Sequence, residues 1–143
     1  MHSHRNGDRI TREMRRFHLI LGLLLFIVFV VTGRFMRADF PDKEIIDQEL
    51  RILMRSRHIY ILFAALMNIL IGLYFQALPR RPQKIVQYLG SAVLSLSALL
   101  LIWAFVQETY TFHHFSDLSR FGIYGSLAGV VLHFLAHFER PSK

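Results

Sequence analysis

Four apolar runs that contain no Asp, Glu, Lys or Arg follow one another along the chain, at residues 17–33, 59–78, 85–107 and 121–138. About 20 helical residues, each rising about 1.5 Å, cross a hydrocarbon core of about 30 Å, so all four runs are long enough, the first and last narrowly. The short alternating strands of a β-barrel are missing from the pattern. The sequence therefore predicts an all-α integral membrane protein. Its transmembrane domain (17–138) is an antiparallel four-helix bundle between a basic segment (1–16) and a tail (139–143).

The connections between these runs carry their own signals. Pro79-Arg80-Arg81-Pro82 indicates a tight turn, which would make the second and third helices an antiparallel hairpin. The longer first connection begins with a proline and has acidic residues early and basic residues late, as a helix dipole favours. Its apolar residues share one helical face: Ile46, Leu50, Leu53 and Met54. We therefore expect an amphipathic helix that lies at the outer interface and runs into the second span.

Charge and composition narrow the class of protein. The 17 Lys and Arg residues outnumber 10 Asp and Glu, but 53% of residues are hydrophobic, which argues against a nucleic-acid-binding protein. Ten of the basic residues lie on the side of the first residue and seven on the other side. The positive-inside rule then predicts an inner-membrane protein with both termini in the cytoplasm. The absence of Cys excludes disulfides and thiolate metal sites.

Histidine is the residue type in this sequence that could best form a functional site. The four runs contain no carboxylate or Lys for a proton or cation pathway, and no hydrolase or transferase motif occurs. Six of the eight histidines fall at two levels of the predicted bundle. The inner level holds His18, His133 and His137, and the outer level holds His58, His113 and His114.

The inner histidines recur with glycines at a spacing of four residues. The fourth run carries Gly125, Gly129, His133 and His137 as one stripe, and the first run carries His18 and Gly22. In both helices a glycine lies one turn toward the midplane from a histidine. Haem b could be held edge-on there, with His18 and either His133 or His137 as axial ligands and with Gly22 and Gly129 leaving room for the ring. Four helices with paired histidines are similar in architecture to small bacterial b-type cytochromes, although no family motif matches residue by residue.

The same residues have a simpler interpretation. Small residues at a spacing of four are the ordinary device for close helix packing in lipid, and histidines near helix ends bond backbone carbonyls or lie at the headgroup level. Asn68, the one strongly polar side chain near a helix centre, is expected to hydrogen-bond across helices. Its candidate neighbours are Gln87, Ser91 and Ser95. At the outer level, His58, His113 and His114 could hold Cu or Zn, although interfacial or solvated histidine is the better-supported interpretation.

Three functions follow from these patterns. The first is a haem b (or other metal) electron-transfer module that exchanges electrons with a quinone or a partner subunit. The second is a cofactor-free accessory or assembly subunit that docks on a membrane-protein partner through the glycine stripe. The third is a small dimeric transporter, which the lack of intramembrane charge disfavours. In each case the lipid bilayer is the main environment, and a partner protein or a second copy is expected.

Overall fold

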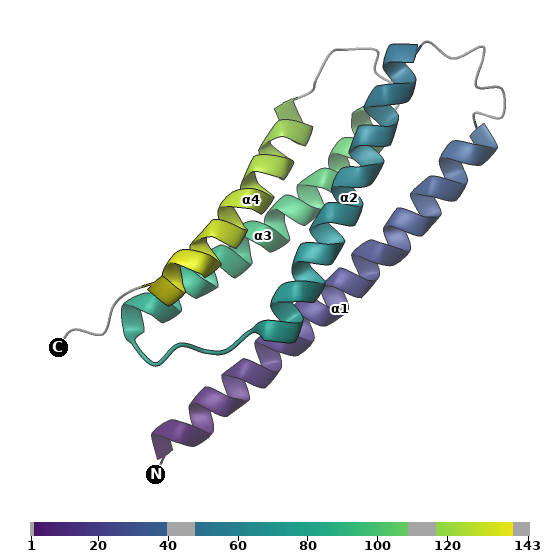
Figure 1. Cartoon of the computed structure of the whole chain (residues 1–143). Helices are drawn as coiled ribbons and strands as arrows, with labels where there is room; N and C mark the ends of the chain where they lie inside the picture. Colours follow the sequence, from purple (N-terminus) through teal and green to yellow (C-terminus); the bar gives the residue numbers. More distant parts are fainter. Residues whose placement is uncertain (1, 40–47, 109–116, 139–143) are drawn as a thin grey trace.

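The structure, a computed structural model that describes residues 2–39, 48–108 and 117–138, is a bundle of four helices (Figure 1). They are α1 (His2–Asp39), α2 (Gln48–Tyr74), α3 (Arg81–Glu108) and α4 (Asp117–Phe138). No strand occurs in these three ranges. Each helix contains a stretch long and apolar enough to cross a membrane. The prediction of a polytopic four-helix membrane protein is confirmed.

The helices associate as two pairs, α1 with α2 and α3 with α4. Contacts run along most of each pair, whereas the pairs meet mainly through α2, which touches α3 and, to a smaller extent, α4. In Figure 1 the beginning of α1 and the end of α4 lie at the end of the bundle where α2 leads into α3, which we call the α2–α3 end. The last residues of α1 and α3 and the first residues of α2 and α4 lie at the other end, the far end.

Glycines set the close approach within each pair. A Cβ on Gly22 of α1 would lie 2.6 Å from Ile69 Cγ1 and 2.9 Å from Ile69 N of α2. In return, a Cβ on Gly72 of α2 would lie 2.8 Å from Leu19 N of α1. Because backbone atoms cannot move aside cheaply, any side chain at either position would force the two helices apart. Glycine is therefore required on both sides of the α1–α2 contact.

An apolar layer fills the middle of the bundle and separates two clusters of polar side chains. Its buried members come from α1, α2 and α3: Leu25, Ile61, Ala64, Ala65, Ala98, Leu101 and Phe105. The alanines on α2 let this central helix approach its neighbours closely. The polar clusters lie on either side of this layer, one toward the α2–α3 end and one at the far end.

α2 ends at Tyr74, four residues before the end of the apolar run that predicted it. The non-helical segment that follows is held by side chains of two other helices. Ala77 N donates to Thr11 Oγ1 of α1 at 3.1 Å, and Gln87 Nε2 of α3 donates to the carbonyl oxygen of Gln76 at 2.8 Å. These bonds satisfy backbone groups that the helix no longer pairs, so an apolar segment can leave the helical conformation within the bundle.

The helix predicted in the first connection continues directly into the second span. From Gln48 onward it forms the first part of α2, with Leu53 and Met54 buried. Residues 40–47, which include the predicted beginning of that helix, lie outside the described residues.

Candidate functional site

Each of the four helices contributes one side chain to a buried cluster toward the α2–α3 end. We call this set, His18, Asn68, Ser91 and His133, the histidine cluster. His18 Nδ1 lies 2.9 Å from Asn68 Oδ1, and His18 Nε2 lies 2.9 Å from Ser91 Oγ. Ser91 Oγ lies 3.1 Å from His133 Nε2. His18 is completely buried. The cluster therefore joins the α1–α2 pair to the α3–α4 pair through one serine hydroxyl.

Phe75, the first residue after α2, lies against both imidazole rings. Its ring is stacked on His18 with centroids 6.4 Å apart, and it meets the edge of His133 at 6.0 Å. The two histidine rings are 6.1 Å apart and nearly perpendicular. Phe75 N still donates to the carbonyl oxygen of Ile71 at 2.7 Å, so the last turn of α2 places this ring over the cluster, where it shields the polar atoms from the surroundings.

Beside the cluster, a mostly apolar groove with a volume of about 330 Å³ lies between α2 and α4. Residues from the last turns of both helices line it, including Ile71, Tyr74, Phe75, Val130, His133 and Phe134. The groove forms here because α2 and α4 belong to different pairs and touch only briefly. Tyr74 and Phe134 are 77% and 61% exposed, so in a membrane this face meets lipid.

His137 lines the groove but is not a member of the histidine cluster. It lies one turn beyond His133 on α4, is exposed, and its Nδ1 lies 2.9 Å from the carbonyl oxygen of His133. Of the two alternatives that the sequence left open for pairing with His18, the structure brings His133 to His18 and leaves His137 in the groove.

The space beside the glycines that were predicted to make room for haem is filled by neighbouring helices. Gly22 lies against Ile69 and Ala65 of α2, and Gly129 lies against Gly90 and Leu94 of α3. Gly125 also faces α3, where a Cβ would collide with Ser97 Oγ. The glycine stripe of α4 is therefore an internal contact, so it does not provide the external docking face that an accessory subunit was expected to use.

Two observations bear on haem ligation at the histidine cluster. The Nε2 atoms of His18 and His133 approach one point, and a carbonyl oxygen of Asn68 faces the other nitrogen of His18, as is usual for a metal-ligating histidine. The Ser91 hydroxyl occupies that point, however, and no gap for a flat macrocycle separates the rings. The donor atoms fit an axial pair, whereas the packing fits haem only if the two helix pairs move apart.

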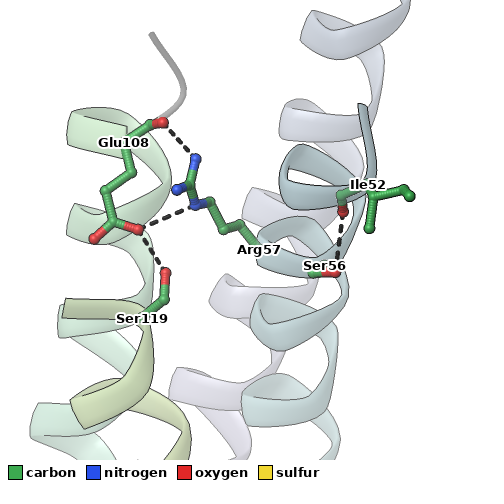
Figure 2. A network of polar contacts seen from close by, with 5 residues as sticks. All are labelled: Ile52, Ser56, Arg57, Glu108 and Ser119. Carbon is green, nitrogen blue, oxygen red and sulfur yellow. Dashed lines mark hydrogen bonds and ion pairs between the residues drawn. The ribbon is translucent and has the colours of Figure 1, made fainter. Parts of the chain in front are cut away.

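A second buried polar cluster lies at the far end and was not predicted from the sequence. Figure 2 shows Arg57 of α2 reaching Glu108, the last residue of α3, and Ser119 of the first turn of α4 reaching the same Glu108. Arg57 Nε lies 3.0 Å from Glu108 Oε2, which also accepts a 2.6 Å hydrogen bond from Ser119 Oγ. Arg57 Nη1 donates to the carbonyl oxygen of Glu108. The two charged side chains are only 3% and 4% exposed, so this ion pair joins helices inside the bundle.

The outer histidines are only partly described. His58 Nδ1 lies 2.9 Å from Thr32 Oγ1 of α1, and its ring stacks on Phe29 at 4.1 Å. His113 and His114 lie outside the described residues, so their predicted metal site with His58 stays a prediction. Within the described ranges, no group of three or more His, Cys, Asp or Glu side chains is placed to hold a metal ion.

Comparisons of the chain with protein-family models, with curated proteins and with solved structures give no match. The geometry of the histidine cluster and of the adjoining groove is therefore what supports a function for this membrane protein.

Proposed function

We propose that the groove between α2 and α4 binds the ring of a lipid-soluble quinone-type carrier, and that the protein serves membrane electron transfer. The observation that carries this proposal is a groove that is apolar and open toward lipid, yet is lined by two histidines, His133 and His137. Binding sites for small molecules typically combine an apolar lining with a few converging polar groups.

Size and lining agree with such a ligand. A volume of about 330 Å³ is near the lower end of the range of about 300–1,000 Å³ that is usual for small-molecule sites. It suits one substituted six-membered ring, with an apolar tail left in the surrounding lipid. The side chains of Tyr74, Phe75 and Phe134 offer aromatic surfaces for that ring. Imidazole nitrogens offer hydrogen bonds to its oxygens.

The expected orientation of the protein in the membrane indicates into which leaflet the groove would open. The distribution of Lys and Arg would place the α2–α3 end on the cytoplasmic side of the inner membrane. The groove would then open into the inner leaflet, where a carrier could exchange electrons with a membrane-protein partner.

The test is photolabelling in liposomes with an alkyl-substituted benzoquinone and its hydroquinone, each carrying a diazirine in the alkyl chain. We expect at least one form to label peptides from the end of α2 and the end of α4. Val130→Trp fills the groove and should abolish this labelling. The matched control is Leu127→Trp on the same helix, at an exposed position that is not among the residues lining the groove. The proposal would be refuted if Val130→Trp left the labelling unchanged. It would also be refuted if neither form labelled either segment.

A second candidate, haem b, is favoured by the convergence of the Nε2 atoms of His18 and His133. When bound, haem would supply one-electron redox chemistry, and these two histidines, one from each helix pair, would hold it. The measurement is an absorption spectrum, oxidised and reduced, of protein purified from haem-replete cells. About one haem per chain is expected in the wild type and in His137→Ala, and none in His18→Ala. A featureless spectrum of the wild type, or full haem content in His18→Ala, would exclude it.

A further inference from the structure

The hydrogen-bond direction of the histidine cluster is set at Asn68. Asn68 Nδ2 donates to the carbonyl oxygen of Ala64 at 2.9 Å, one turn earlier on α2. The amide is therefore oriented with Oδ1 toward His18 Nδ1, at 2.9 Å. An amide oxygen can only accept, so His18 Nδ1 carries the hydrogen of the neutral ring. Both side chains are fully buried, so no solvent competes for these bonds.

The donor and acceptor roles fixed at His18 determine those of His133 through the hydroxyl of Ser91. Because His18 Nδ1 is protonated, Nε2 has only a lone pair and must accept from the Ser91 hydroxyl at 2.9 Å. Ser91 has then used its hydrogen, so its oxygen accepts from His133 Nε2 at 3.1 Å. His133 is left with a lone pair on Nδ1. The amide of Asn68 thus determines, through two intervening side chains, which tautomer of His133 lines the groove.

The second histidine of the groove, His137, also has a ring nitrogen left that can only accept a hydrogen bond, for a reason that does not involve Asn68. His137 Nδ1 lies 2.9 Å from the carbonyl oxygen of His133, which can only accept, so His137 Nδ1 is also protonated. In the neutral ring, the remaining nitrogen, Nε2, has a lone pair. The nitrogens that both histidines have left for a ligand are therefore acceptors.

We propose that the groove selects the reduced, hydroquinone form of the carrier over the quinone. This inference rests on the proposed function and specifies the redox state that the groove binds. A hydroquinone has two O–H donors, which match two imidazole lone pairs. A quinone has only carbonyl oxygens, which would face those lone pairs without a hydrogen between them. Asn68 and Ser91 act as positioning residues for this selectivity.

The experiment compares the two photoreactive forms under anaerobic conditions in the full-length protein in liposomes. In the wild type the hydroquinone should reach half-maximal labelling of the groove at about 30-fold lower concentration than the quinone, as expected from two net hydrogen bonds, one to each histidine. Asn68→Leu removes the acceptor that fixes His18, and Ser91→Ala breaks the connection one step later. In both variants the preference should fall to about fivefold, the part that His137 alone supplies.

Two matched variants separate this effect from a loss of structure. Ser91→Thr keeps the hydroxyl and should keep the preference. Ser95→Ala, one turn along α3, removes a hydroxyl that donates to the carbonyl oxygen of Ser91 within its own helix, and it should also keep the preference. Should Asn68→Leu fail to fold, Ser91→Ala still tests the same step.

The outcomes distinguish the two proposals. If neither form labels the wild type, the proposed function fails. Equal labelling by both forms leaves the function standing and refutes the selectivity. A hydroquinone preference that persists unchanged in both Asn68→Leu and Ser91→Ala would overturn the role of the histidine cluster in setting it.

Discussion

Gly90 of α3 and Gly129 of α4 face each other so closely that a Cβ on either one would lie 2.9 Å from the carbonyl oxygen of the other. The same reciprocity holds for the α1–α2 contact, where Gly22 and Gly72 each lie against backbone of the opposite helix. In each pair, glycines on both helices therefore allow the two backbones to approach closely. This packing and the two polar clusters can be tested separately by substitution.

Gly129→Ala should destabilise the bundle by about 1–3 kcal/mol, because the new methyl group would meet backbone atoms of Gly90 and Leu94 that cannot rotate away. The measurement is equilibrium unfolding in mixed micelles by titration with a denaturing detergent. Gly7→Ala on α1 is the control, since a Cβ there would have no neighbour within 4 Å, and alanine should be neutral or gain up to about 1 kcal/mol. Equal stability of the two variants would contradict the close α3–α4 contact.

Removing one charge of the Arg57–Glu108 pair should cost more than removing both. Glu108→Gln leaves the guanidinium of Arg57 buried without its counter-charge, and a loss of about 3–5 kcal/mol is expected. The double variant Arg57→Met with Glu108→Leu should be less destabilised than either Arg57→Met or Glu108→Leu alone, because no buried charge remains. Unfolding free energies of the complete double-mutant cycle decide this. Strict additivity would show that the two side chains do not interact.

Ser91→Ala should lower the free energy of unfolding by about 1–2 kcal/mol, because it leaves a buried nitrogen of His18 and one of His133 without a partner. Ser95→Ala is the matched substitution on the same helix, and its effect should stay within about 0.5 kcal/mol, since a bond within its own helix is lost. Similar losses in the two variants would mean that Ser91 does not join the helix pairs.

Much of the fold could be predicted because apolar runs of about 20 residues have few alternatives in a membrane. The end of α2 at Tyr74 could not, since the hydrogen bonds that allow it come from Thr11 and Gln87, on two other helices. The length of an apolar run predicts which residues lie in the membrane. A helix end depends instead on which hydrogen-bond partners are available to its backbone.

The histidine cluster was predicted in part. Spacing identified His18 and His133 but could not distinguish His133 from His137, because both lie on one face of α4 and the choice depends on which turn of α4 is level with His18. Sequence reasoning also named Ser91 among three candidate neighbours of Asn68. The structure shows that Ser91 reaches Asn68 through His18. Such indirect contacts depend on the arrangement of all four helices.

The Arg57–Glu108 pair was missed because the two residues are far apart in sequence and each stands at the edge of an apolar run, where charge is ordinary. A signal was nevertheless present. The residues carry opposite charges, and both were expected at the same level of the membrane. Charges that border two different spans at one depth are worth testing as partners.

The pairing of helices that are neighbours in the chain has a consequence for biogenesis. N-terminal segments are synthesised first, so α1 and α2 can associate in the bilayer before α3 and α4 have been inserted. At that stage Asn68 already satisfies one nitrogen of His18, while the other must wait for the serine of α3. The α3–α4 pair, which is synthesised later, therefore supplies the hydrogen-bond partner that His18 lacks in the α1–α2 pair alone. Assembly of the whole bundle is in this way favoured over persistence of its first half.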